Sequence, residues 1–217
     1  MNPLNGVLLV DKPVGMTSHD VVARARRILG TKGIGHAGTL DPLASGLLLL
    51  LIGEGTKVSD YLLNGDKTYE LNCKLGVATD SMDITGEVLR EQPVTSSLEE
   101  IKAAVAKLQG TLTLKVPLHS AVKVDGKKLY EYAHKGQTPE PNIIPDREMT
   151  FYDVQLIETT MASASPSGST NVIVRMSCSK GSFIRAWANN LGEDLGCGGT
   201  VEGLRRVASN PFTVANA

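Results

Sequence analysis

The sequence predicts an α+β fold with a mixed, mainly antiparallel sheet that is flanked by helices. Apolar, strand-like runs occur in both halves of the chain, and amphipathic helical patterns are interspersed among them. The 217 residues, of which 41% are hydrophobic, are enough to bury a full core. No internal repeat or clear linker divides the chain.

The first half supplies strands and two helices. Gly6–Val10 has the pattern of a buried strand, and Leu47–Ile52, the longest apolar stretch, that of a central strand. Between them Ser18 is placed to cap a helix that ends at Gly30. A short helix over Thr56–Leu63 leads into a third strand. The apolar face of the first helix consists of Val21, Val22, Ala25, Ile28 and Leu29.

The middle of the chain combines a scaffold helix with an insertion. Ser97 and Glu100 have the spacing of a capping box and begin a helix that Gly110 closes. Residues Lys115 to Arg147 are rich in Gly, Pro and Lys and only weakly periodic. This composition predicts an extended, partly mobile insertion.

The last part predicts two strands and a helix. Phe151–Glu158 and Asn171–Cys178 flank a polar loop over Ser163–Ser169, and a helix runs from about Ser182 to Leu195. Arg185 lies in the first turn of that helix, where a cation opposes the positive end of the helix macrodipole. Such local violations tend to mark functional sites.

The N-terminus, the apolar stretches and the cysteines do not fit a secreted, membrane-spanning or disulfide-rich protein. The N-terminus lacks the features of a signal peptide and no apolar stretch reaches membrane-spanning length, so we expect a cytoplasmic protein without membrane contact. Cys73, Cys178 and Cys197 are widely separated, which predicts buried reduced thiols and neither a disulfide framework nor a zinc site.

The net charge of −1 does not by itself indicate a nucleic-acid partner, but the charges are unevenly distributed. If the basic residues of the second half and the C-terminal segment line one face, a phosphate-binding surface can coexist with near neutrality. The alternative is that they are ordinary solvated charges. These residues are Lys123, Lys127, Lys128, Lys180, Arg185, Arg205 and Arg206.

One loop carries the strongest candidate for catalysis. In His36-Ala-Gly-Thr-Leu-Asp41-Pro-Leu-Ala-Ser-Gly46 a single carboxylate stands between glycines, directly before the central strand. Pro42 favours an extended conformation at Asp41, so its side chain is presented by a loop. Read alone, Asp-Pro between glycines is an ordinary turn initiator; the rest of the chain overturns that interpretation.

The loop resembles the G-x-L-D-P-x-A-x-G motif of the TruB family of tRNA pseudouridine synthases, and four further blocks follow the family's order. The resemblance runs from Gly6 to about Pro211, nearly the whole chain. The blocks are Gly6–Pro13 with Gly15–Ser18, Asp66–Tyr69 with Leu75–Gly76 and Thr79–Asp80, Ser120–Lys123 with Gly126–Ala133, and Cys178–Arg185 with Leu204–Arg206.

The resemblance implies a pseudouridine synthase fold in which residues 1–217 form one catalytic domain, with a thumb-like insertion at about 115–147 that folds against RNA. The C-terminal RNA-binding domain usual in the family is absent from this sequence. The expected substrate is the T-loop uridine at position 55 of tRNA, held through the T-arm stem-loop by a monomer. No cofactor or metal is implied.

The resemblance also assigns roles to residues. Asp41 is the nucleophile, Arg185 pairs with it, and Tyr69 stacks on the flipped uracil and is a candidate proton acceptor. His36 contacts the RNA around the target. Three further positions complete the expected site: Lys12 supports it, Leu204 lines the uracil pocket, and Phe183 stands where the family usually has tyrosine, which leaves any contact of that hydroxyl in doubt.

Two alternatives belong to other classes. Gly33-Ile-Gly-His-Ala-Gly38 satisfies the dinucleotide-binding pattern, but a charged helix end precedes it and Pro42 interrupts the helix that should follow. A non-catalytic RNA-binding module that retains the scaffold is the second alternative. The presence of both Asp41 and Arg185 argues against it.

Overall fold

A computed structural model describes residues 4–133, 144–161 and 170–217. They cluster into two compact units, which we describe separately. The first unit comprises the residues up to Glu70, Ser177–Lys180 and Gly203–Ala217, and the second comprises Leu71–Met176 and Gly181–Glu202. The strands with residues in both units are β4 (Lys67–Leu75), β11 (Thr170–Cys178) and β12 (Gly199–Ser209).

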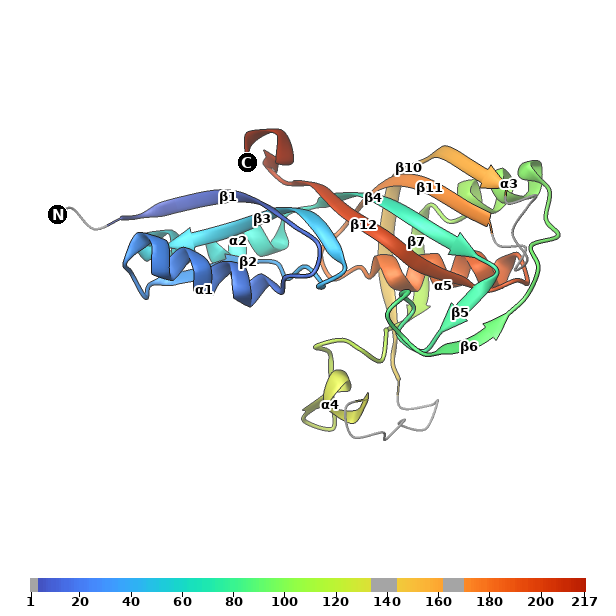
Figure 1. Cartoon of the computed structure of the whole chain (residues 1–217), viewed down its shortest axis with the longest axis horizontal. Coiled ribbons are helices and arrows are strands. Elements are labelled where there is room, and N and C mark those ends of the chain that lie inside the picture. The colour runs from blue at the N-terminus through green and yellow to red at the C-terminus, as the bar shows by residue number, and fades with distance from the viewer. Residues whose placement is uncertain (1–3, 134–143, 162–169) are drawn as a thin grey trace. The chain divides into compact units, whose positions relative to one another are not determined.

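The first unit is built around strand β3 (Figure 1). This strand pairs antiparallel with β1 and β2 and parallel with β12, and α1 and α2 both pack on β2. The sheet is therefore mixed, as the sequence predicted. The remaining elements of this unit are β1 (Gly6–Lys12), α1 (Ser18–Leu29), β2 (Ile34–Ala37), β3 (Ala44–Ile52), the 3-10 helices η1 (Gly53–Val58) and η2 (Val214–Asn216), α2 (Ser59–Asn64) and β13 (Phe212–Thr213).

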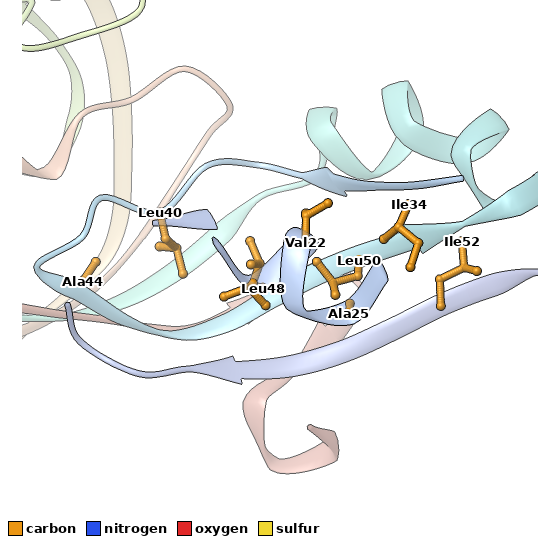
Figure 2. Packing of buried hydrophobic residues seen from close by; sticks show 9 residues of the cluster. Val22, Ala25, Ile34, Leu40, Ala44, Leu48, Leu50 and Ile52 are labelled. Carbon is orange, nitrogen blue, oxygen red and sulfur yellow. The ribbon is translucent and has the colours of Figure 1, made fainter. Parts of the chain in front are cut away.

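Both faces of β3 are buried, because successive side chains of a strand point to opposite faces. Leu48 and Leu50 pack on one side in a cluster with Val22 and Ala25 of α1, as Figure 2 shows. Alternate residues contribute to a second cluster that consists of Ala37, Leu47, Leu49, Leu51 and Leu62. The continuous leucine run of this strand thus reflects burial on two sides.

The N-cap of helix α1 lies one residue before the cap predicted from the sequence. Thr17, not Ser18, is the N-cap. Its side chain accepts from the backbone N–H of Asp20, and the Asp20 carboxylate accepts from the backbone N–H of Thr17. Gly30 ends the helix in the left-handed conformation, as predicted. Ile28, expected in the core, is instead 70% exposed.

The second unit places two helices against the far strands of the sheet. The strand order is β4–β11–β10–β7, with α3 on β10 and α5 on β7. Trp187 of α5 is fully buried and its indole N–H donates to the carbonyl of Leu108 at 2.9 Å. The elements are β5 (Val77–Thr79), β6 (Val88–Glu91), α3 (Leu98–Lys107), β7 (Gly110–Lys115), β8 (Lys123–Val124), β9 (Lys127–Lys128), α4 (Leu129–Ala133), β10 (Asp146–Met161) and α5 (Ile184–Asp194).

The predicted insertion begins where β7 ends. Its described part contains the short β8–β9 hairpin and α4, while residues 134–143 lie outside the described chain. The predicted loop over Ser163–Ser169 also lies outside it. Helix α3 has the expected capping box of Ser97 and Glu100, but it ends at Lys107, and Gly110 begins β7 instead of closing the helix.

Two further findings concern composition. All three cysteines are free and buried, as predicted, and burial raises the pKa of the Cys73 thiol to about 12. Within the described ranges, no helix has both the length and the apolar character needed to cross a membrane.

Candidate active site

The loop that carries Asp41 connects β2 to β3, and its backbone is tied at several points. The carbonyl of Asp41 accepts from the N–H of Ala44 at 3.0 Å, and the carbonyl of Pro42 accepts from the N–H of Gly15 at 2.8 Å. Asp41 itself is half-buried. A loop with these bonds presents the carboxylate in a defined place, as a reacting group requires.

The residue before Asp41 is fixed from the side of α1. Ser18 is buried, and its hydroxyl donates to the carbonyl of Leu40 at 3.1 Å and accepts from the N–H of Leu40 at 2.9 Å. The Leu40 side chain is 3% exposed and packs with Ala44 in the cluster of Figure 2. The hydroxyl that the sequence assigned to a helix cap therefore holds the Asp41 loop.

Lys12 lies at the end of β1 and is fully buried. Its ammonium donates to the carbonyls of Pro13 at 3.0 Å and Met16 at 2.7 Å. Burial lowers the pKa of Lys12, while the negative charge of Asp41 acts in the opposite direction and raises it. Lys12 thus places a positive charge close to the Asp41 loop, which agrees with a supporting role.

Tyr69 lies on β4 and packs, together with Leu204, against the same apolar cluster as Leu40. Burial raises the pKa of the Tyr69 phenol. The positive charge of Arg206 and a hydrogen bond to its side chain lower that pKa, and the negative charge of Asp41 raises it. The first unit therefore brings Asp41, Lys12, Tyr69 and Leu204 into one neighbourhood.

His36 lies on β2, five residues before Asp41. Its ring meets that of His19 edge to face, with 5.3 Å between the centroids. Burial lowers the pKa of the His36 imidazole, and the charges of His19 and Arg206 lower it further. Among the described residues, the buried Nδ1 of His36 has no hydrogen-bond partner. Its contact with RNA stays a prediction.

Arg185 belongs to the second unit and is 6% exposed at the start of α5. Its Nη1 donates to the carbonyl of Ser81 at 3.0 Å and its Nη2 to the carbonyl of His119 at 2.8 Å. Asp83 lies 3.6 Å from Nη1 and is itself buried. These contacts fix the guanidinium within this unit, and its pairing with Asp41 stays a prediction.

Asp83 is the acidic residue that the sequence analysis missed. Its carboxylate accepts from the hydroxyl of Ser81 and the N–H of Thr85, both at 3.0 Å, so it is held firmly beneath Arg185. The sign of this role in the sequence is weak, because Asp83 lies in an acidic stretch that resembles a solvated surface.

Phe183 precedes α5 and is half-buried, with its N–H directed at the sulfur of Met149. Its contact with uracil stays a prediction.

Comparison with known proteins identifies the family. A model of the TruB family of pseudouridylate synthases, in its N-terminal domain, matches residues 26–184, more than half of the chain. The chain belongs to this family. The family inferred from the Asp41 loop and the accompanying blocks is thereby confirmed.

Curated relatives match along the whole chain. The tRNA pseudouridine synthase B of Bdellovibrio bacteriovorus is 48% identical over 217 residues, which cover 100% of this chain and 67% of that protein. The tRNA pseudouridine synthase B of Ralstonia pickettii is 47% identical over 214 residues, which cover 99% of this chain and 65% of that protein. The chain thus spans about two thirds of the length of these relatives.

A solved structure supports the fold. A chain in the crystal structure of a Cbf5-Nop10-Gar1 complex is 28% identical and superposes with a TM-score of 0.70, covering 96% of this chain and 50% of that one. The predicted pseudouridine synthase fold, with its mixed sheet and flanking helices, is therefore confirmed.

The structure corrects the proposed basic face. Arg185 and Arg206 are buried, with 6% and 1% exposure, and cannot line an exposed phosphate-binding surface. Arg205 forms a bidentate pair with Asp11, with distances of 3.0 and 2.7 Å. Among the predicted cations, Lys123, Lys127 and Lys180 are exposed. Neither the shared basic face nor the alternative of solvated charges holds for Arg185 and Arg206, because both are buried, and sequence alone does not distinguish a buried arginine from an exposed one.

The structure also removes the dinucleotide alternative. In a dinucleotide site the glycine-rich pattern must open a helix whose N-terminus holds the pyrophosphate. Here residues Ile34–Ala37, within the pattern, form β2 and pair with β3. The pattern therefore belongs to a strand and the loop after it.

Proposed function

We propose that this chain isomerises uridine to pseudouridine in RNA, with Asp41 as the nucleophile. The observation that carries the proposal is the Asp41 loop. Its backbone is tied to α1, to Gly15 and to β3, and Lys12 and Tyr69 lie close enough for their pKa values to respond to the charge of Asp41. A carboxylate that a tied loop holds in one place is suited to act as a nucleophile.

The reaction breaks the C1′–N1 bond of uridine and forms a C1′–C5 bond. Atoms balance within the nucleotide, because C5 loses a proton and N1 gains one. Asp41 attacks either C1′ or C6 and is released when the new bond has formed. The protein must therefore supply a nucleophile, an enclosed space in which uracil turns, and an acceptor for the C5 proton.

Tyr69 can act twice during the reaction, first as a wall of the space that holds the uracil and then as the acceptor for the C5 proton. A phenol whose pKa is raised by burial stays protonated at neutral pH, so its ring acts first as a stacking surface for the flipped base. It accepts the C5 proton only if a nearby positive charge stabilises the phenolate. Flipping the nucleotide costs a few kcal/mol, which stacking offsets.

For the substrate, we propose the T-loop uridine at position 55 of tRNA, presented by the T-arm stem-loop to a monomer in the cytoplasm. The names of the curated relatives support a tRNA substrate. Arg185, His36, Phe183 and Leu204 keep the roles that the family resemblance gave them.

The test is nucleotide analysis of an unmodified tRNA transcript after incubation with the protein. We expect one pseudouridine per molecule, at position 55, and none in a transcript that carries cytidine there. An isolated T-arm stem-loop should also be modified. RNA binding without any pseudouridine would instead establish the alternative, a non-catalytic RNA-binding module.

A further inference from the structure

Arg206 of β12 is among the largest fully buried side chains of the described chain, at 1% exposure. Its Nε donates to the carbonyl of Leu47 at 2.7 Å and its Nη2 to the carbonyl of Gly38 at 3.2 Å. Gly38 precedes Asp41 and Leu47 follows it. One guanidinium therefore joins the start of the loop that carries the proposed nucleophile to the strand that follows it, β3.

The two glycines around Asp41 leave room for this arginine. β12 and β3 pair in parallel with Arg206 opposite Gly46, and a Cβ at Gly46 would overlap the carbonyl oxygen of Arg206 and lie 2.8 Å from its backbone nitrogen. A Cβ at Gly38 would lie 3.3 Å from Nη1. Both glycines have a positive φ, of +98° and +92° respectively. The loop is thus shaped around Arg206.

The positive charge of Arg206 influences the pKa of Tyr69 and of other titratable side chains around the Asp41 loop. It lowers the pKa of Tyr69 against the larger effect of burial, and it also lowers the pKa values of Lys12, His36 and Lys67. A guanidinium stays charged under all working conditions. A buried, permanent positive charge next to the Tyr69 hydroxyl would stabilise a phenolate that forms during the reaction.

We propose that Arg206 is a positioning residue of the active site, which holds the Asp41 loop closed through the carbonyls of Gly38 and Leu47 and directs the Tyr69 hydroxyl. This inference rests on the proposed function. Since Arg206 is buried, it touches no RNA. Its loss should therefore slow the chemical step and leave RNA affinity unchanged.

Two substitutions of Arg206 separate the effect of its two hydrogen bonds from the effect of its charge. Arg206→Lys keeps the charge, but one ammonium nitrogen cannot occupy the positions of both Nε and Nη2, from which the guanidinium reaches the carbonyls of Leu47 and Gly38. We expect its single-turnover rate at saturating enzyme to fall on the order of a hundredfold, the scale of a small misplacement of a reacting group. RNA affinity should stay within about threefold. Arg206→Gln also removes the charge that favours the Tyr69 phenolate, so the pH at which its rate rises through deprotonation of Tyr69 should move upward.

Arg205→Lys is the matched control, because Arg205 is the neighbouring arginine on the same strand and pairs with Asp11 away from these carbonyls. Its single-turnover rate should equal that of the wild type. Thermal unfolding of each variant shows whether it is folded. If the Arg206 variants do not fold, Gly38→Ala disturbs the same guanidinium with Arg206 in place and should reproduce the loss in rate.

The proposal is overturned if a folded Arg206→Lys keeps a rate within about threefold of the wild type, or loses RNA affinity in proportion to rate. An Arg206→Gln variant whose rate rises at the same pH as that of the wild type overturns the part that concerns Tyr69. With both Arg206 variants unfolded, a normal rate in Gly38→Ala overturns the positioning role. Failure of the proposed function is a separate result, because the wild type would then form no pseudouridine at all.

Discussion

At the scale of single residues, the first unit depends on cations that are buried against carbonyl oxygens. Lys12 donates to two carbonyls and Arg206 to two others, on either side of Asp41 in the chain. Burying a charge without partners is costly, so each of these side chains needs the backbone around it in one conformation. The contacts of Arg206 therefore fix the Asp41 loop directly, while those of Lys12 fix the turn at residues 13–16, from which the N–H of Gly15 bonds the carbonyl of Pro42.

His36 should make folding stability depend on pH. Burial holds its pKa below the ordinary value of 6.5, so the unfolded chain takes up the proton first as the pH falls. The stabilising contribution of His36 is complete above pH 6.5 and is lost as the pH falls through the folded-state pKa. Urea unfolding should show a smaller decline between about pH 7.5 and about pH 5.5 for His36→Gln than for the wild type. Equal declines would mean that His36 is not the group responsible.

Arg185→Lys should be far from conservative. One ammonium nitrogen cannot occupy the positions of both Nη1 and Nη2, which bond the carbonyls of Ser81 and His119, so an acceptor loses its partner at a cost of about 1–3 kcal/mol in the free energy of unfolding. The rate of pseudouridine formation should also fall strongly, which single-turnover assays measure.

The control for Arg185 is Arg90→Lys in the same unit. Arg90 pairs with Glu193 at a largely exposed site, so its replacement should change stability by less than about 1 kcal/mol. Near-normal turnover of a correctly folded Arg185→Lys would show that the buried guanidinium plays no part in the reaction.

At the scale of elements, the close approach of β3 to β12 sets the place of the loop. Gly46→Ala would drive its Cβ into the Arg206 backbone at a positive φ, and should lower the free energy of unfolding by at least about 2 kcal/mol. Gly35→Ala, on β2, is the control, because a Cβ there meets no atom within 4 Å. Chemical denaturation of both variants checks the difference, and comparable losses would contradict the account of this strand pair.

Elements with a strong apolar period were predictable, while those built around polar residues were not. The sequence predicted β1, β3, α1, α3 and α5 within a few residues, because their apolar residues recur at a strand or helix spacing. It missed β12, whose central residues Glu202, Arg205 and Arg206 are charged and interrupt an apolar alternation. It also missed β2, because Gly33, Gly35 and Gly38, in and beside this strand, match the pattern of a phosphate-binding loop.

The candidate site shows the same division. Asp41, Tyr69 and Lys12 were found because they belong to motifs, and the structure places them in one unit. The contacts that hold the loop were not predictable: Ser18 bonds Leu40 across 22 positions, and Arg206 reaches Gly38 across 168. Such long-range polar bonds leave no periodic signal in the sequence.

At the scale of the whole molecule, a net charge of −1 means that a phosphate-binding surface depends on where the cations are placed and not on their total number. With two motif arginines buried, the exposed candidates are Lys180 and two lysines of the β8–β9 hairpin, Lys123 and Lys127. Replacing Lys123 and Lys127 together by alanine should weaken tRNA binding and reduce its salt slope by about 0.9 for each duplex phosphate that the protein no longer neutralises. Lys102→Ala, on α3, should leave the slope unchanged. A slope unaltered by the double substitution would exclude the hairpin from the RNA interface.

The most direct test of the central claim is the effect of Asp41→Asn on chemistry and binding, measured separately. An amide keeps the shape of the side chain but is not a nucleophile, so pseudouridine formation should be abolished while tRNA affinity stays within about tenfold, or about 1.4 kcal/mol. A single-turnover assay with saturating Asp41→Asn decides the matter. Activity within about tenfold of the wild type would contradict the assignment of Asp41 as nucleophile.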